Sequence, residues 1–402
     1  MIFPVRLRLK MLAALVLGCM IPLMHASASL EFSTFDQRAT NGETLCVAFL
    51  GGSLTWGAQA TDPLKTSYRA LVSEKLRKTY PKAHFRFIDG AIGGTGSQLA
   101  AFRLQRDILA YKPDLVFLDF TINDNPYEVP SPIRLASYES LVHRMIEAGI
   151  PVVQVILPAK KDVLPNPPSR PLDPEHKKIG AAYGLPLADA VAVVKERVAA
   201  GKATPDQLWD LPEDGTHPGD AGYALYAETA WAAYEKAVNE RAHCRLAQPM
   251  VAPDTYMTVN RCRLSSLGAL PEGWKAGVPH RNAIAFDFVC SRWMDELSIA
   301  TAGNATAPAP LVLNVRAAEI LLFGEGTQKS GSYAVRIDGG EAKRFNAACK
   351  DGNMRLVQIV ATGLDPAITH RVEIIPELKE GQELRLESVC LAGAPASIEL
   401  AK

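Results

Sequence analysis

The hydrophobic positions of the chain follow two different patterns, one in each half. Between Leu45 and about Arg245, short apolar runs alternate with segments in which apolar residues recur at the spacing of one helix face. Such runs are typical of buried strands, and such spacing is typical of helices with one apolar side. Strands that alternate with helices indicate a parallel sheet covered by helices on both faces. We therefore predict an α/β unit in this half.

Four apolar runs are predicted as the strands of this sheet, namely residues 45–50, 84–88, 115–120 and 152–157. The irregular segment 158–174 contains six prolines and directly follows the fourth strand. A long loop in this place either forms one wall of a site or is a plain surface connection.

Two helices of this half have an apolar face that is clear from the sequence. Residues 68–80 carry Tyr68, Val72 and Leu76 on one side, as a helix packed on a sheet does. The closing helix of the unit places these residues on one face: Ala224, Ala227, Trp231, Tyr234 and Val238.

After Arg245 the helical spacing fades and strands separated by Gly, Pro or Asp take its place. The predicted strands are residues 310–315, 332–337, 355–359, 371–375 and 383–389. In the second of them Tyr333, Val335 and Ile337 alternate with more polar neighbours, as expected of a sheet with one buried face. This half is therefore predicted as a β-sandwich.

The length and composition of the chain fit two globular domains. Its 402 residues are 48% hydrophobic, which is enough for two cores. We predict one domain over residues 29–245 and a second over residues 246–402. Lys and Arg together number 43, as do Asp and Glu, so the net charge is zero. Since no basic stripe is present, a nucleic-acid partner is not expected.

The first 28 residues have the pattern of an export signal. Arg6, Arg8 and Lys10 precede an apolar run over residues 11–24, and the small residues 26–28 then provide a cleavage site. A lipoprotein site at residues 16–19 is the alternative, but the apolar run continues past Cys19. No later run reaches the roughly 20 apolar residues of a membrane span. We predict an exported protein, periplasmic or extracellular, without stable membrane insertion after signal cleavage.

Cysteine usage agrees with an oxidising compartment. Without Cys19 six cysteines remain, enough for up to three disulfides: Cys46, Cys244, Cys262, Cys290, Cys349 and Cys390. Cys46 opens the predicted first strand and Cys244 ends the predicted last helix, so both are expected at the same end of the α/β layer. We predict a disulfide between these two.

Ser53, Asp214 and His217 are the residues with the chemistry of a nucleophilic site. A serine hydroxyl needs an imidazole base, and the base needs a carboxylate that fixes its tautomer. Ser53 lies in a glycine-rich turn after the first predicted strand, and Asp214 precedes His217 by three residues. Taken singly, Ser53 is also a good helix cap, and Asp214 a good turn residue. Together they predict a catalytic triad.

Two further loops are expected beside Ser53. Gly94 follows the second predicted strand and Asn123 the third, and loops at the carboxyl ends of parallel strands meet at one edge of the sheet. The backbone N–H groups of Ser53 and Gly94 and the side-chain amide of Asn123 are therefore predicted to form an oxyanion hole. Alone, Asn123 is more typical of a turn, and the glycines around Gly94 do not fit the register of a dinucleotide-binding loop.

These segments resemble the conserved blocks of the SGNH (GDSL-type) serine hydrolases over roughly residues 45–240. The resemblance implies a flavodoxin-like three-layer α/β/α hydrolase domain, followed here by a β-sandwich (jelly-roll-like) domain. It also implies Ser53 as the nucleophile, Asp214 and His217 as its partners, and Gly94 and Asn123 as oxyanion donors. One departure is that the aspartate usual before the nucleophile is Gly52 here. Such an enzyme needs no metal or organic cofactor.

The expected activity is that of an exported serine esterase. An exported enzyme with an appended β-sandwich resembles carbohydrate esterases that remove acetyl groups. The expected substrate is therefore an acylated polysaccharide or small molecule. A lipase or lysophospholipase is the first alternative. A non-catalytic glycan-binding protein is an alternative of another class. Of the remaining histidines, His143 and His176 are expected on helix surfaces.

Overall fold

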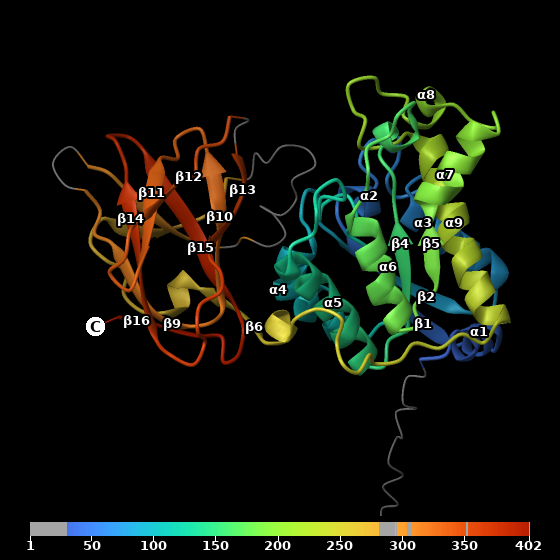
Figure 1. Cartoon of the computed structure of the whole chain (residues 1–402), viewed down its shortest axis with the longest axis horizontal. Helices are drawn as coiled ribbons and strands as arrows, with labels where there is room; N and C mark the ends of the chain where they lie inside the picture. Colours follow the sequence, from blue (N-terminus) through green and yellow to red (C-terminus); the bar gives the residue numbers. More distant parts are fainter. Residues whose placement is uncertain (1–29, 281–293, 295, 304–306, 351–352, 402) are drawn as a thin grey trace, which may run out of the picture.

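The computed structural model describes residues 30–280, 294, 296–303, 307–350 and 353–401, which form two halves lying side by side (Figure 1). The first half is built on a parallel sheet and the second on two antiparallel sheets. The predicted signal peptide, residues 1–28, and Cys290 lie outside the described residues. Within the described ranges, no helix is both long and apolar enough to cross a bilayer.

The sheet of the first half has five parallel strands in the order β2-β1-β3-β4-β5. The strands are β1 (Thr44–Gly51), β2 (His84–Ala91), β3 (Leu115–Asp119), β4 (Val152–Ile156) and β5 (Leu187–Asp189). This is the strand order of flavodoxin-like folds. The predicted fold is confirmed, and so are the four predicted strands, whereas the short β5 has no counterpart among them.

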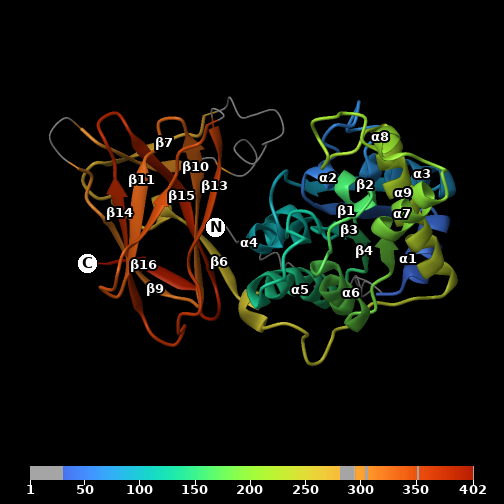
Figure 2. The same cartoon turned by 45° about the horizontal axis from the view of Figure 1, so that its top comes forward.

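Helices cover both faces of this sheet (Figures 1 and 2). On one face α4 (Ser97–Asp107), α5 (Pro132–Glu147) and α6 (Leu172–Ala182) pack on one another. On the other face α1 (Phe32–Thr40), α3 (Tyr68–Thr79) and α7 (Ala190–Ala199) pack on α9 (Asp220–Asn239). Two short helices, α2 (Ser53–Trp56) and α8 (Pro205–Leu208), complete this half.

Burial explains why the strands of this sheet are apolar throughout. Every residue of β3 and β4 is buried, as are all residues of β1 after Thr44. A parallel strand between two helix layers has no solvent face, so its sequence is a continuous apolar run. The predicted helix over residues 68–80 is confirmed as α3, with Tyr68, Val72 and Leu76 buried.

The second half is a β-sandwich, as predicted. Its strands are β6 (Val259–Arg263), β7 (Trp274–Gly277), β8 (Leu297–Thr301), β9 (Leu311–Arg316), β10 (Glu319–Thr327), β11 (Ser332–Ile337), β12 (Lys343–Asn346), β13 (Asn353–Ala361), β14 (His370–Glu377), β15 (Glu383–Ala392) and β16 (Ser397–Leu400). One sheet has the order β13-β10-β15-β8-β7, with β6 also paired to β15, and the other has the order β12-β11-β14-β9-β16. An apolar core fills the space between them.

Strand β10 has both faces buried, because one face of its sheet packs on the first half. Ile320 and Leu322 belong to the core between the two sheets. Leu321 and Phe323 point to the other side, where they share a second apolar cluster with Leu99 of α4. The two halves are therefore joined in part through a buried apolar cluster.

The segment between α9 and β6 runs back along the first half before it enters the sandwich. The backbone N–H groups of Val251 and Ala252 donate to the carboxylate of Glu139 on α5, at 2.7 and 2.5 Å. Further along, Asp254–Met257 forms a short helix, η3, that packs on α5. The domain boundary at residue 245 stays a prediction.

The predicted Cys46–Cys244 disulfide is wrong, because both thiols are free. Cys46 lies on β1, whereas the sulfur of Cys244 lies against the carbonyl oxygen of Val152 on β4, at 3.9 Å. Strand β3 lies between β1 and β4. Two strand spacings are about 10 Å, which is beyond the reach of a disulfide. The two cysteines do lie in one α/β layer, but not on neighbouring strands.

We expect alkylation to distinguish these thiols from a disulfide. Burial raises the pKa of Cys46, and it raises the pKa of Cys244 to about 11, so neither forms the reactive thiolate readily in the folded protein. Iodoacetamide at pH 8 should leave both unmodified in native protein. In guanidinium chloride without reductant it should modify both, as peptide mass mapping would show. A cross-linked Cys46–Cys244 peptide would contradict the structure.

Candidate active site

Ser53 lies at the carboxyl end of β1, as the first residue of the short helix α2. The two glycines before it are tightly packed: a Cβ on Gly51 would come within 2.1 Å of Thr55 Oγ1. Because Gly51 and Gly52 have no side chains, the backbone can turn tightly here and place the serine hydroxyl at the edge of the sheet. Ser53 is 7% exposed, so its hydroxyl lies in a partly closed site.

The three residues of the predicted triad lie in one hydrogen-bonded relay. The Nε2 atom of His217 is 2.7 Å from Ser53 Oγ, although 164 residues separate them in the chain. The Nδ1 atom of the same ring is 2.7 Å from Asp214 Oδ2. A carboxylate can only accept, so Nδ1 carries the proton of the neutral ring and Nε2 is left to accept from the serine hydroxyl. The role of these three residues as a catalytic triad stays a prediction.

Hydrogen bonds from two other segments hold the Asp214–His217 turn and the adjoining start of α9 in place. The carbonyl oxygen of Gly215 accepts from the backbone N–H of Lys160, which follows β4, at 2.8 Å. At the start of α9, Asp220 accepts from both the backbone and the hydroxyl of Thr61, at 2.9 and 2.6 Å. Thr61 follows Ser53 by eight residues, so this contact connects the segment of Ser53 to the segment that carries Asp214 and His217. None of these partners has a motif that would have identified it from sequence.

The pKa of Asp214 is lowered by the bonds that it accepts. Partial burial acts to raise this pKa, but hydrogen bonds from the backbone and ring of His217, and from the backbone of Thr216, outweigh it. The two backbone bonds, from Thr216 and His217 to Oδ1, measure 2.9 and 3.0 Å. Asp214 is therefore a carboxylate near neutral pH, as a partner of an imidazole must be.

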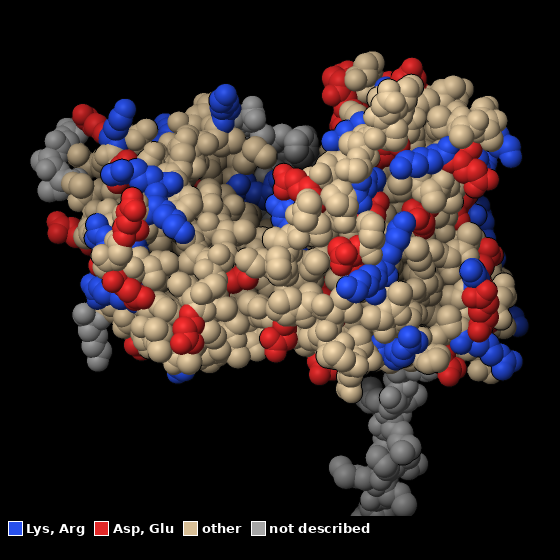
Figure 3. All heavy atoms as spheres, in the orientation of Figure 1, with Lys and Arg blue, Asp and Glu red and all other residues tan. Residues whose placement is uncertain are grey.

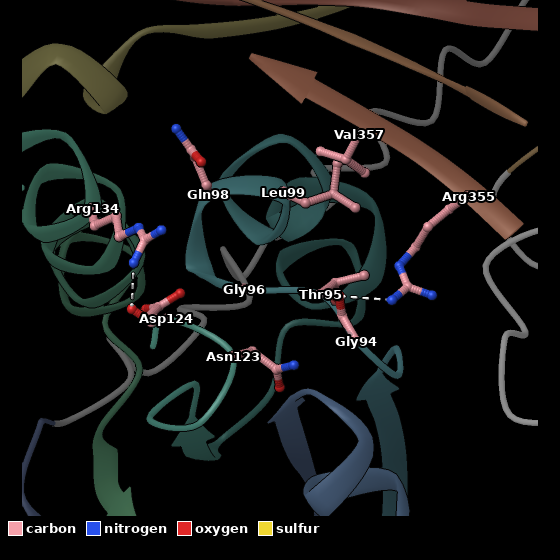
Figure 4. A pocket seen from close by; sticks show the side chains of 10 residues that line it. All are labelled: Gly94, Thr95, Gly96, Gln98, Leu99, Asn123, Asp124, Arg134, Arg355 and Val357. Carbon is pink, nitrogen blue, oxygen red and sulfur yellow. Dashed lines mark hydrogen bonds between the residues drawn. The ribbon is translucent and has the colours of Figure 1, made fainter. Parts of the chain in front are cut away.

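Gly94 and Asn123, the other predicted oxyanion donors, lie at the same edge of the sheet. Gly94 adopts a left-handed backbone conformation, with φ of +64°. The side-chain oxygen of Asn123 lies against Gly52, since a Cβ at residue 52 would be 1.9 Å from it. In Figure 4 the amide nitrogen of Asn123 points to the Gly94 side of the pocket. The loops after β1, β2 and β3 thus meet, and the role of these groups as donors stays a prediction.

A buried carboxyl group joins the two loops that carry Gly94 and Asn123. Asp124 accepts from the backbone N–H of Ser97, at 2.8 Å. Burial, which the hydrogen bonds from Ser97 only partly offset, raises the pKa of Asp124 to about 7. Its second oxygen faces Nε2 of His176 at 3.7 Å.

The expectation that His176 lies on a helix surface is wrong. His176 is 1% exposed, and its ring stacks on Tyr138 with centroids 3.8 Å apart. Burial, together with the nearby charge of Arg170, lowers the pKa of His176 to about 3. The ring is therefore neutral at ordinary pH, and it packs as an aromatic side chain between helices.

A polar cavity of about 320 Å³ opens beside these loops, between the two halves of the chain. The space-filling view shows that the surface is hollowed between the halves (Figure 3). From the first half the cavity is lined by Gly94, Asn123 and Arg134, among others, and from strand β13 by Arg355 and Val357. Figure 4 shows the guanidinium groups of Arg134 and Arg355 on opposite sides of it. Sequence reasoning missed the two β13 residues, which follow the triad by more than 130 positions.

Segment 158–174 contacts the Asp214–His217 turn through Lys160. Besides the bond to Gly215, the Lys160 ammonium group pairs with Asp206 on α8 at 2.7 Å. Within the same segment Asp162 pairs with the buried Arg170. Across the described ranges, no three His, Cys, Asp or Glu side chains are grouped in a way that could hold a metal ion.

Comparison with known proteins gives a family and a fold. Residues 49–225 match the sequence model of the GDSL-like lipase/acylhydrolase family. The whole chain is similar to the two-domain esterase CEX, described as active on acetylated mannans. One structure of CEX has a TM-score of 0.70 at 25% identity and covers 92% of this chain and 98% of its own. Another, with mannopentaose, has a TM-score of 0.72 at 24% identity and covers 90% and 95%. No curated protein sequence matches the chain.

The lowered pKa of Asp214 gives a test of the relay. In His217→Ala the ring hydrogen bond is lost, and we expect the pKa of Asp214 to rise, as a carboxyl-carbon NMR titration would show. A carboxyl with a lowered pKa stabilises the fold above its ordinary pKa, and that contribution disappears as pH falls through the lowered value. The variant should therefore lose stability at neutral pH relative to wild type, and less at acid pH. Asp220, whose bonds come from Thr61, is the internal control and should titrate unchanged. An unchanged pKa at Asp214 would contradict the relay.

The contact between Gly52 and Asn123 gives a second test. In Gly52→Ala the new Cβ would displace the Asn123 amide. Since loss of one oxyanion donor costs about 10²-fold to 10³-fold in rate, we expect a boronic acid that adds to Ser53 to bind at least about tenfold more weakly. Gly303→Ala, where a Cβ meets no atom within 4 Å, is the matched control. Equal boronate affinity in both variants would show that Asn123 is not part of the oxyanion hole.

Proposed function

We propose that this chain, a serine ester hydrolase whose residues 49–225 match the sequence model of the GDSL-like lipase/acylhydrolase family, removes acetyl groups from a carbohydrate. The observation that carries this proposal is the relay from Ser53 Oγ through His217 to Asp214, with both contacts at 2.7 Å. Gly94 and Asn123, the two other predicted oxyanion donors, line a polar cavity to which both halves of the chain contribute.

In the proposed first step Ser53 attacks the ester carbonyl. His217 Nε2 takes the hydroxyl proton as the Oγ–carbon bond forms, and Asp214 stabilises the imidazolium that results. The carbonyl oxygen becomes an oxyanion, which accepts hydrogen bonds from the backbone N–H groups of Ser53 and Gly94 and from Asn123. Each such donor contributes on the order of 3 kcal/mol to the transition state.

The second half of the reaction restores the serine. His217 returns its proton to the sugar oxygen as the ester C–O bond breaks, and the sugar leaves with a free hydroxyl. Water then attacks the acetyl-serine while His217 Nε2 accepts its proton. When the intermediate collapses, that proton passes to Ser53 Oγ and acetate is released.

Two observations support a carbohydrate as the alcohol. The cavity beside Ser53 is lined mainly by polar and charged groups, among them Gln98, Asp124 and Arg134, and hydroxyl-rich sugars bind through such hydrogen-bonding groups. The two-domain esterase that this chain resembles along nearly its full length acts on acetylated mannans. A lipase or lysophospholipase is the alternative acyl hydrolase, and it would need an apolar channel for the acyl chain.

We also propose that the enzyme is exported. The basic residues Arg6, Arg8 and Lys10, the apolar run that follows and the small residues 26–28 support a cleaved signal peptide. Edman sequencing of the protein secreted by its host would test this, and a mature chain that still begins at Met1 would refute it.

We expect wild type to release acetate from acetylated mannan and to cleave short acyl esters faster than long ones. Ser53→Ala should lose about 10³-fold or more of this rate, because it removes the nucleophile. The control is Ser265→Ala, at an exposed serine of the second half. Cleavage of long acyl chains alone would favour the lipase alternative. Glycan binding without turnover in wild type and Ser53→Ala alike would favour a non-catalytic binding protein.

A further inference from the structure

Arg355 connects the β-sandwich directly to the loop that carries Gly94. It lies on β13, the strand at one edge of the sandwich sheet that faces the first half. Its Nη2 atom donates to the carbonyl oxygen of Gly94 at 2.9 Å, across 261 residues of sequence (Figure 4). The guanidinium group also fills the space that a side chain at residue 94 would take, since a Cβ there would be 1.7 Å from Nη2.

The packing around β13 fixes the position of this guanidinium group. In the pairing of β10 with β13, Val357 lies opposite Phe323, which is fully buried against α4. In addition, Gln98 of α4 donates to the hydroxyl of Tyr256, which donates to Glu319 of β10, at 2.8 and 2.7 Å. An apolar cluster and a buried hydrogen-bond chain thus hold the two halves in one register.

The loop over residues 92–97 is therefore held from both sides. Asp124 holds the backbone N–H of Ser97 from the α/β half, and Arg355 holds the carbonyl of Gly94 from the sandwich. Gly94 has φ of +64°, a conformation that glycine leaves readily when nothing restrains it. Its N–H can serve an oxyanion only while the peptides on either side keep their orientation.

We propose that Arg355 is a positioning residue for the oxyanion hole, so that the β-sandwich takes part in catalysis on every ester and not only in holding a glycan. This inference rests on the proposed function, in which the Gly94 N–H is an oxyanion donor. Arg355 acts through Gly94 and does not itself contact the reacting atoms.

The test compares Arg355→Ala and Arg355→Lys in the full-length enzyme on p-nitrophenyl acetate, an ester too small to need a glycan site. We expect Arg355→Ala to lower kcat about tenfold to a hundredfold, with KM within about twofold of wild type, because transition-state stabilisation is lost. Arg355→Lys should retain part of the rate. Added guanidinium ion should restore part of the rate of Arg355→Ala, which a merely structural loss would not allow.

The matched control is Arg344→Ala, on β12 of the same sandwich. The side chain of Arg344 is 76% exposed and pairs across the surface with Glu377, so its removal should leave kcat and KM unchanged. Hydrogen exchange of a peptide spanning residues 92–97 should become faster in Arg355→Ala and stay unchanged in Arg344→Ala.

Several outcomes would overturn the proposal. Wild-type kcat and unchanged exchange in Arg355→Ala would show that Arg355 does not position the loop. A rise in KM confined to acetylated mannan would make Arg355 a glycan-binding residue instead. If Arg355→Ala unfolds at a lower temperature than wild type, the proposal is judged on Arg355→Lys instead. A kcat of Arg355→Lys no higher than that of Arg355→Ala would then contradict it. A wild-type protein without activity on any ester would refute the proposed function, whereas the exchange comparison would still decide whether Arg355 holds the loop.

Discussion

The site depends on one contact, the 2.7 Å hydrogen bond between His217 Nε2 and Ser53 Oγ. Its partners are far apart in sequence, and a hydrogen bond of this kind contributes only about 1 kcal/mol of net stability. It cannot hold the two segments together by itself. The buried strands β1 and β3 and the packing of α9 on α3 bring the two segments together. The hydrogen bonds between Thr61 and Asp220 and between Lys160 and Gly215 then fix their relative position more closely. The apolar core therefore determines the distance on which the chemistry depends.

Apolar packing also holds the β-sandwich against the α/β half. Because Leu321 and Phe323 of β10 are fully buried against α4, the sandwich is not a tethered module that moves independently of the α/β layer. Inter-domain interfaces that are small and polar permit relative motion, but large apolar ones do not. Arg355 and Val357 of β13 provide one part of the cavity wall, and Gln98 and Leu99 of α4 provide another. Both halves of the chain therefore form the cleft.

Sequence alone predicted the parts of this structure that are encoded locally. The strands of the parallel sheet are continuous apolar runs. The predicted triad rests on the glycine-rich turn that carries Ser53 and on the three-residue spacing of Asp214 and His217. Strand β10 was not predicted, because its apolar run, residues 320–323, is only four residues long and is followed by Gly324, Glu325 and Gly326. The Cys46–Cys244 pairing was wrong because chain order does not show that Cys46 lies on β1 while Cys244 lies against β4, with β3 between the two strands. Arg355 gave no signal at all, since its partner is a backbone carbonyl whose position only the packed interface determines.

The glycine at position 52 shows how a departure from a family pattern is accommodated by its neighbours. By resemblance an aspartate is usual there, but the oxygen of Asn123 lies 1.9 Å from the place where a Cβ would stand. A side chain at 52 and this Asn123 rotamer therefore exclude each other. With the oxygen turned to the Gly52 backbone, the amide nitrogen is left to face the cavity, which is the orientation that an oxyanion donor needs. The absence of a side chain at residue 52 thus leaves room for this orientation of Asn123.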